Sequence, residues 1–370
     1  MKFTCEKNAL VSAVSVASRT VAQKSTIPAL EGIYIRAGVK LTLSGYNLAT
    51  GITISVDAEI QQTGACIMPS RLFFDIIRKL PGDTVSISVD EKFKVSIRGG
   101  ISSFTITAMS SEDYPELPEV ESDKGISLPQ NELKAMIGGT SFAVSENQAR
   151  PIHTGCLFEV EDTSITVVAV DGYRLALRRW KSEEPIGRTL KFVVPAAALK
   201  EAEKILGDTD EACTFFLGSK HILFTIGEAT LVCRLLEGEF LDWRRVLPQN
   251  QPVKLAVNVA KMTDSIERVG LIISEKLKSP VRCKFGENTA DFRSVSTIGE
   301  AHDVCQIAGD GQDMEIGFNC RYLLDALRAI PDAECSLELI NGLSPIVMNP
   351  CDGSERYSYM VLPVRLKAGE

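Results

Sequence analysis

Few residues in this sequence have the types and spacing that catalysis needs. The chain has no G-x-x-x-x-G-K-[ST] loop, no H-E-x-x-H pair and no G-x-S-x-G elbow, the commonest signatures of hydrolases and transferases. Its three histidines, His153, His221 and His302, have no second ligand at metal-binding spacing. The G-x-G at 309–311 lacks a third glycine and is predicted to be a turn between strands, and Asp171 before a glycine is also typical of a turn. The sequence therefore predicts a protein that is not an enzyme and has no cofactor or metal site.

The ten cysteines also lack a pattern that would do chemistry. They are scattered singly, without a C-x-x-C pair, and most lie inside apolar strand-like runs, such as ACTFFL around Cys213 and LVCRLL around Cys233. In a long chain without an export signal, the expected state is a set of buried free thiols rather than disulfides or metal ligands.

The composition is typical of a soluble globular protein. Of the 370 residues, 45% are hydrophobic and 24% are charged. No apolar run approaches the roughly 18 residues that span a bilayer, and the start MKFTCEKNAL lacks the apolar core of a signal peptide. We therefore expect a cytoplasmic protein without a membrane partner. The net charge of −8 argues against coating nucleic acid by bulk attraction, but it leaves room for a localised basic surface.

A strand, a turn and an amphipathic helix recur in three places and position the charged residues of interest. The three stretches are 65–83, 192–208 and 314–332, about 125 residues apart. Matching helical positions are apolar or aromatic in all three: Leu72, Phe73, Ile76 and Leu80; Ala198, Leu199, Ala202 and Leu206; Tyr322, Leu323, Ala326 and Ile330.

An acid and a base also repeat on the polar side of these helices. They are Asp75 with Arg78, Glu201 with Lys204, and Asp325 with Arg328. Because the two residues lie one helical turn apart, one interpretation is an ion pair on each helix. The other is that the basic side chains face a ligand.

The repeat predicts three domains, at 1–122, 123–250 and 251–370, with polar linkers at 110–125 and 238–252. Each domain is expected to open with a strand and a helix, in which Leu10, Leu133 and Met262 occupy matching positions. In the third domain RCKFG, TADFRSVST and AHDVCQI are expected to be separate strands. Two helices and about eight strands per domain indicate an α+β fold, with both helices packed on one face of antiparallel sheets.

Six motifs give the sequence a resemblance to a known family. They are the start MKFT, PSRLFFDIIRKLP at 69–81, VDGYRLAL at 170–177, EGEFLDWRRVLP at 237–248, FNCRYLLDALRA at 318–329 and YMVLPVRL at 359–366. In this order they resemble the bacterial sliding clamps, the DNA polymerase III beta subunit family, over the whole chain. The resemblance implies a head-to-tail homodimer that closes a ring around duplex DNA, lined by the helices, and confers processivity on the replicative polymerase. The rival interpretation is a non-catalytic repeat scaffold without DNA encirclement, which predicts a monomer or an open chain of copies.

The resemblance also implies that basic residues on or beside the helices face the DNA. A few weak phosphate contacts inside an acidic body would permit sliding, whereas tight ones would stop it. The loop residues among them correspond best to the family's DNA contacts, and Arg78, Lys204 and Arg328 are open to the ion-pair interpretation. The candidates are Lys24, Arg71, Arg78, Lys79, Asn147, Gln148, Arg150, Lys200, Lys204, Arg268, Arg321 and Arg328.

A peptide pocket between the second and third domains is implied as well. In the family it takes a short segment, rich in Gln, Leu and Phe, from partners that include the polymerase alpha subunit, the clamp-loader delta subunit and other proteins with a clamp-binding motif. Tyr173 stands where a histidine is common and Leu241 where a proline is common, and Leu175 and Val246 have ordinary core as an alternative role. The matching residues are Val170, Gly172, Tyr173, Arg174, Leu175, Leu241, Arg245, Val246, Ser344, Pro345, Met360, Leu362, Pro363, Val364 and Arg365.

The family's dimer joins domain one of one chain to domain three of the other, edge strand to edge strand, around a small apolar core. The matching residues are Phe104 and Ile106, against Leu271, Ile272 and Ile273. Period-two alternation places Phe104 and Ile106 on one face of their strand, where the alternative is that they belong to the core of their own domain.

Overall fold

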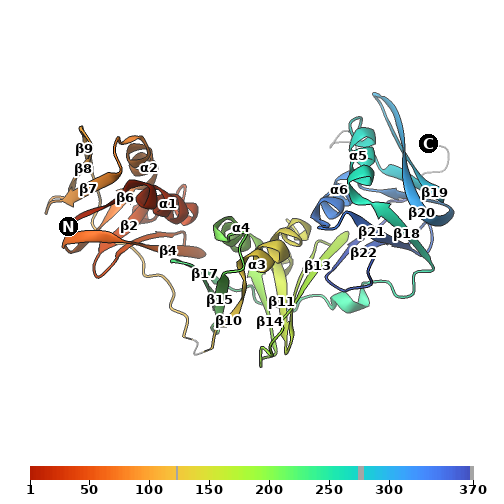
Figure 1. Ribbon diagram of the computed structural model, residues 1–370, viewed down its shortest axis with the longest axis horizontal. Helices are drawn as coiled ribbons and strands as arrows, with labels where there is room; N and C mark the ends of the chain where they lie inside the picture. The colour runs from red at the N-terminus through yellow and green to blue at the C-terminus, as the bar shows by residue number, and fades with distance from the viewer. Residues whose placement is uncertain (122–123, 274–278, 367–370) are drawn as a thin grey trace. The chain divides into compact units, whose positions relative to one another are not determined.

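Each repeat contributes two α-helices to the computed structural model, which describes residues 1–121, 124–273 and 279–366 (Figure 1). The second helix of each repeat lies where the apolar spacing predicts it. The helices are α1 (Lys7–Ala17), α2 (Ser70–Lys79), α3 (Gln130–Gly138), α4 (Ala196–Ile205), α5 (Val259–Gly270) and α6 (Cys320–Ala329). Short 3₁₀ helices lie at Ser18–Thr20 (η1), Pro28–Glu31 (η2), Ser141–Ala143 (η3), Pro151–Thr154 (η4) and Trp243–Arg245 (η5).

The helices bury their apolar faces and leave their basic faces in solvent. Phe73 of α2 is fully buried, whereas Leu72, one residue earlier, is 50% exposed. The side chain of Asn319 begins α6 by accepting the backbone N–H groups of Arg321 and Tyr322, which would otherwise lack partners at a helix start. Helix α1 packs against α2, and α5 packs against α6 (Figure 1).

One compact unit comprises residues 1–134 and 197–235. It contains a five-stranded sheet in the order β5-β1-β7-β8-β9 and an eight-stranded sheet in the order β10-β15-β16-β17-β4-β3-β2-β6, all antiparallel in the pairs between neighbours. The eight-stranded sheet runs across the first domain junction, because β4 pairs with β17 from Ile54 opposite Ala229 to Thr50 opposite Cys233. The strands are β1 (Lys2–Glu6), β2 (Gly32–Ala37), β3 (Leu41–Tyr46), β4 (Thr50–Val56), β5 (Ala58–Gln62), β6 (Gly64–Pro69), β7 (Thr84–Val89), β8 (Lys94–Gly99), β9 (Ser102–Thr107), β10 (Ile126–Pro129), β15 (Ala212–Leu217), β16 (His221–Ile226) and β17 (Ala229–Arg234).

The second compact unit comprises residues 135–196 and the chain from Leu236 onward. Its ten-stranded sheet has the order β14-β11-β12-β13-β23-β22-β21-β18-β20-β19. This sheet runs across the second junction in the same way, with Leu175 of β13 opposite Met360 of β23. The strands are β11 (Gly155–Glu161), β12 (Ser164–Val170), β13 (Arg174–Lys181), β14 (Leu190–Pro195), β18 (Val253–Asn258), β19 (Val281–Ser296), β20 (Gly299–Phe318), β21 (Glu334–Leu339), β22 (Ile346–Pro350) and β23 (Tyr357–Val361).

The third domain departs from the predicted strand pattern. The three segments expected there as separate strands lie on one long hairpin, with β19 of 16 residues and β20 of 20 residues. The turn predicted at 309–311 was wrong, because these residues lie within β20 where the pairing register with β19 shifts, and Gly309 takes the positive φ of 121° there. The prediction of about eight strands per domain therefore fails for this domain.

The first linker is fastened to the first domain by an aromatic contact. The ring of Tyr114 stacks on that of Tyr34 with 5.0 Å between centroids, and its hydroxyl donates to the backbone oxygen of Ser44 at 3.3 Å. Burial, together with the neighbouring Tyr46 and Tyr34, raises the pKa of Tyr114. The acidic part of the linker around Tyr114 is therefore packed against the first domain.

The cysteines are free thiols, as predicted, and most of them are buried. Burial raises the pKa of Cys66 and Cys233 to about 12. Two differ from this pattern, because Cys320 is half-buried and Cys351, in the turn after β22, is exposed.

Candidate functional site

An apolar cluster in the second compact unit brings together several of the predicted pocket residues. Val170, Leu175 and Met360 are 4%, 1% and 3% exposed, and Val246 and Leu362 pack half-buried against them. Leu175 therefore has the burial of a core residue, whereas Val246 keeps exposed surface at the border. The other buried members are Leu157, Val168, Leu177, Val193, Phe240, Trp243 and Val347.

Exposed side chains from three segments surround this cluster. Tyr173 is 63% exposed, Leu241 43% and Val364 38%, and the arginines Arg245 and Arg365 are also exposed. Ser344 and Pro345 are half-buried. The sequence interpretation missed their neighbour Leu343, which is 81% exposed; an apolar residue after the turn residues Asn341 and Gly342 is the signal that marks it.

The C-terminal segment of the site is fixed by backbone hydrogen bonds. After β23 ends, the N–H of Leu362 donates to the carbonyl of Tyr173 at 2.8 Å, and the N–H of Val364 donates to the carbonyl of Gly317 at 2.8 Å. Pro363, which has no N–H, falls between these two donors. The segment 360–364 is therefore held at defined positions although it lies close to the chain end.

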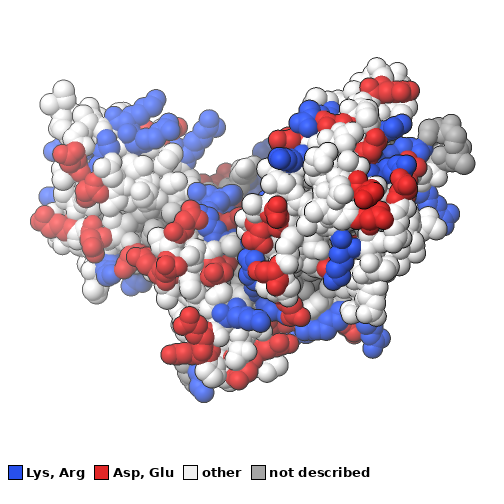
Figure 2. Space-filling view, turned by 45° about the vertical axis from the view of Figure 1, so that its right-hand side comes forward, with Lys and Arg blue, Asp and Glu red and all other residues white. Residues whose placement is uncertain are grey.

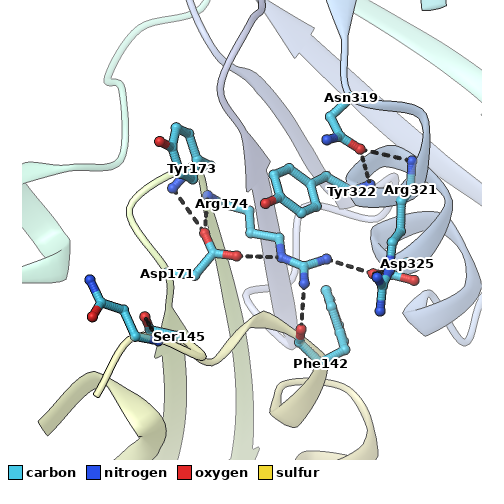
Figure 3. A network of polar contacts seen from close by, with 10 residues as sticks. Phe142, Ser145, Asp171, Tyr173, Arg174, Asn319, Arg321, Tyr322 and Asp325 are labelled. Carbon is cyan, nitrogen blue, oxygen red and sulfur yellow. Dashed lines mark hydrogen bonds and ion pairs between the residues drawn. The ribbon is translucent and has the colours of Figure 1, made fainter. Parts of the chain in front are cut away.

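Arg174 lies at the centre of a polar network beneath the loop that carries Tyr173 (Figure 3). Its guanidinium donates from Nε to Asp171 at 2.9 Å, from Nη1 to Asp325 at 2.6 Å, and from Nη2 to the backbone oxygen of Phe142 at 2.7 Å. The arginine is 8% exposed. A buried guanidinium with two carboxylates joins the loop after β12, the chain after α3 and helix α6 in one geometry.

Aromatic rings pack around the same guanidinium. The ring of Tyr322 on α6 lies 4.3 Å from the guanidinium carbon of Arg174, and the ring of Phe142 lies 5.4 Å from it. Tyr173 stacks on Tyr322 with 6.3 Å between centroids (Figure 3). Burial raises the pKa of Tyr322, and the charge of Asp171 adds to the effect. Arg174 was among the residues predicted to line the peptide pocket, but its side chain is committed to this network, so the exposed part of the loop is Gly172 and Tyr173.

The asparagine and basic residues predicted to face DNA are all exposed, as are Gln148 and its loop. Acidic and basic side chains are interspersed on the face drawn in Figure 2. Among the described residues, no carboxylate lies within ion-pair distance of Lys24, Arg71, Lys79, Arg150 or Lys200. These five side chains are therefore the ones whose charge is least neutralised locally.

The repeated acid and base behave differently in the three helices. Arg78 pairs with Asp75 at 3.4 Å, and Lys204 pairs with Glu201 at 2.7 Å, so the ion-pair interpretation holds in the first two repeats. In the third repeat Arg328 pairs with Glu267 of α5 at 2.7 Å, because Asp325 is occupied by Arg174. Arg321 lies 4.0 Å from Asp325, and Arg268 pairs with Asp303.

The loop after η3 holds three of the candidates in an exposed turn. Asn147 Oδ1 accepts the N–H of Ala149 at 2.9 Å, and the N–H of Arg150 donates to the carbonyl of Asn147 at 3.2 Å. His153 follows, with its ring edge on Phe240 at 5.0 Å, and burial, with the nearby charge of Arg150, lowers the pKa of His153. This histidine packs against the second linker.

The residues predicted at the dimer contact lie in two different settings. Phe104 is 41% exposed on β9, an edge strand, while Ile106 packs half-buried against the core of its own domain. Leu271, 82% exposed, follows α5 with Ile272 and Ile273. These three residues were expected on an edge strand, but they form a turn, in which the N–H of Ile273 donates to the carbonyl of Gly270 at 3.0 Å.

In the described part of the chain, no group of three or more His, Cys, Asp or Glu side chains has an arrangement that would hold a metal ion. Within the same residues, no helix has the length and apolar character needed to cross a membrane.

Comparison with known proteins gives three family matches in succession. The DNA polymerase III beta subunit N-terminal domain matches residues 1–118, its central domain residues 127–242, and its C-terminal domain residues 244–365. A beta sliding clamp of Staphylococcus aureus is 32% identical over 378 residues, and one of Staphylococcus epidermidis is 33% identical over 381 residues. In both cases the alignment covers 99% of this chain and 99% of the relative.

Solved structures resemble the fold over nearly the whole chain. A putative DNA polymerase III beta subunit from Eubacterium rectale superposes with a TM-score of 0.93 at 32% identity, covering 98% of this chain and 99% of that one. A DNA polymerase sliding clamp from Bacillus subtilis superposes with a TM-score of 0.93 at 30% identity, covering 99% of this chain and 100% of that one.

Proposed function

The chain belongs to the DNA polymerase III beta subunit family, and from that membership we propose how its surfaces serve a DNA sliding clamp. The single observation that carries the proposal is the succession of three clamp-domain matches along the whole chain. The protein acts as a non-catalytic subunit that tethers the polymerase to its template. Nothing in the family relationship supports the alternative of a repeat scaffold that does not encircle DNA.

Two copies joined head to tail would close a ring around the duplex. Retention is then topological, since an unbroken circle of DNA has no end over which a closed ring can pass. Lys24, Arg71, Lys79, Arg150 and Lys200 are exposed and have no carboxylate partner within the ranges that the structure describes, which supports a role in weak phosphate contact. The net charge of −8 supports sliding, because weak contacts in an acidic body do not anchor the ring.

The apolar cluster with its exposed rim is the proposed peptide pocket. Val246 and Leu362 supply half-buried apolar surface packed on the cluster that contains Met360, whose thioether makes that cluster adaptable, and Tyr173 and Leu241 extend the surface into solvent. The partners proposed for it are the polymerase alpha subunit, the clamp-loader delta subunit and other proteins that carry a Gln-, Leu- and Phe-rich segment.

The proposed dimer contact sets Phe104 and Ile106 of one chain against Leu271, Ile272 and Ile273 of the other. The exposure of Phe104 on the edge strand β9 and that of Leu271 after α5 support it, because exposed apolar groups at an edge gain most from being covered. We also propose three domains, with the bounds 1–122, 123–250 and 251–370. The proposed location is the cytoplasm, because the template is chromosomal DNA.

The test is retention on DNA. The protein is loaded on nicked circular plasmid by a clamp loader, the salt is raised to about 0.5 M to screen ordinary phosphate contacts, and bound protein is measured by gel filtration. Retention on circles with loss after linearisation is the expected result. Equal loss from circular and linear DNA would contradict encirclement.

A further inference from the structure

Glu159 is a buried carboxylate that the sequence interpretation did not use. It lies on β11, two residues after Leu157 of the apolar cluster, and therefore on the same face of the sheet. The residue is 8% exposed. The signal in the sequence is a glutamate at an inward position of the apolar strand CLFEVE.

Three donors from two segments converge on this carboxylate. The indole N–H of Trp243 donates to Oε2 at 3.0 Å, and Nη1 of Arg244 donates to the same oxygen at 2.8 Å. The ammonium group of Lys191 on β14 lies 3.3 Å from Oε1. A buried carboxylate with this many donors has its charge compensated and fixes the positions of the donors.

Trp243 and Arg244 belong to the second linker, which carries three of the pocket residues. Residues 236–252 have little regular structure beyond the three residues of η5. The linker instead rests on Trp243, 5% exposed within the apolar cluster, and on Arg244, whose guanidinium carbon lies 4.2 Å from the Trp243 ring. Leu241 and Val246 flank this anchored pair, so their positions depend on it.

We propose that Glu159 is a positioning residue of the peptide pocket, acting through Trp243 and Arg244 to set Leu241 and Val246 for the incoming peptide. The proposal rests on the proposed function of the pocket. Glu159 itself does not reach the peptide. Without Glu159 the indole N–H of Trp243 and the guanidinium of Arg244 lose their shared acceptor. The linker is then no longer fixed in the position that places the side chains of Leu241 and Val246.

The experiment measures binding of a fluorescein-labelled peptide rich in Gln, Leu and Phe to the full-length protein and to Glu159→Ala and Glu159→Gln. We expect the affinity to fall on the order of tenfold in Glu159→Ala. Glu159→Gln keeps one acceptor oxygen for the indole N–H and is expected to retain part of the affinity. The matched control is Glu161→Gln, which removes the other carboxylate near Arg244, at 3.4 Å, from an exposed position and is expected to stay within about twofold.

A second readout separates positioning from general destabilisation. In a Trp180→Phe background Trp243 is the one remaining tryptophan, since the sequence has two. Glu159→Ala is expected to shift its emission to longer wavelength while the sedimentation of the protein stays that of the parent. Unchanged affinity in a folded Glu159→Ala protein overturns the inference, as does lost affinity without a change at Trp243. If the parent protein itself fails to bind the peptide, the proposed function of the pocket is what fails.

Discussion

At the scale of single residues, Asp325 shows how a surface position can become part of a site. One of the two sequence interpretations paired it with Arg328 one turn along α6, as its counterparts pair in the other two repeats. It instead accepts from Arg174, which lies far away in the sequence, at 2.6 Å. Helical spacing predicts only local partners such as Arg328, so nothing in the sequence indicated the pairing with Arg174, which is 151 residues away.

Asp325→Ala should therefore be more damaging than its position on a helix surface suggests. Arg174 would keep Asp171 but lose one buried partner, which is expected to lower the free energy of unfolding by about 1–3 kcal/mol and to weaken peptide binding by loosening the Tyr173 loop. The matched control is Asp75→Ala, because Asp75 pairs only with the exposed Arg78 and its removal is expected to cost under about 0.5 kcal/mol. Urea unfolding and peptide polarisation check both. Equal effects of the two substitutions would contradict the role of the network.

Asp303 makes a prediction about acid stability. The hydrogen bond from Arg268 is the main cause that lowers the pKa of Asp303. Because the pKa of Asp303 is lower in the folded state, its ion pair adds to the free energy of unfolding at pH values above the unfolded-state pKa, about 3.9. This stabilisation is lost as the pH falls through the lower folded-state pKa. In Asp303→Asn we expect the melting temperature to fall less steeply on acidification below about pH 4, measured against the parent. If the melting temperatures of the two proteins fall equally steeply below about pH 4, the prediction is wrong.

At the scale of elements, the helices were the most predictable part of the fold. Their apolar period and the Pro-Gly-Asp stop after α2 are local signals, and the second helix of each repeat lies where they indicate. The long hairpin of β19 and β20 was not predictable in this way. Glycines at 309 and 311 read as a turn in sequence, but a register shift within a long strand needs the same backbone freedom, and the choice depends on the pairing with β19.

The turn after α5 carries a prediction about the dimer. Ile272→Ala with Ile273→Ala should remove apolar surface that we propose is covered in the dimer, raising its dissociation constant at least about tenfold. Val39→Ala is the control, since Val39 is fully exposed at the β2–β3 turn of the eight-stranded sheet, whereas Phe104 lies on β9 of the five-stranded sheet. Sedimentation at low protein concentration measures both. An unchanged dimer in the double variant would show that the contact lies elsewhere.

For the proposed pocket, the resemblance pointed to segments that the structure brings together in one apolar cluster, but not to the residues that support them. The motif at 237–248 pointed to Leu241 and Val246 by resemblance. Trp243 and Arg244 stand in the same motif, yet their acceptor Glu159 lies on a strand of another segment. Contacts between distant segments depend on the order of the strands in the sheet, and the sequence of one chain does not give that order.

At the scale of the whole molecule, the thiols report on how well the cores exclude solvent. Cys351 is the exposed cysteine, while burial raises the pKa of Cys213 and Cys320 to about 11. At about pH 8 the thiols of the buried Cys213 and the half-buried Cys320 stay protonated and react slowly. Burial and the neighbouring acidic side chains raise the pKa of Cys351 as well, but its exposure lets a reagent reach it. We therefore expect Ellman's reagent to modify Cys351 in a phase faster than that of the other cysteines in the native protein, and all ten cysteines after denaturation. Rapid loss of several thiols in native buffer would contradict the buried placement, and Cys351→Ser is the control that should abolish the fast phase.

The two sheets that cross the domain junctions limit how the chain can be dissected. Strand β17 completes its hydrogen bonding on β4, and strand β13 completes its own on β23. A fragment that contains the central domain alone would therefore have two newly exposed edge strands, β13 and β17, each with a row of unpaired backbone N–H and C=O groups. Such edges recruit other chains, so the excised piece should aggregate even though its own fold is intact.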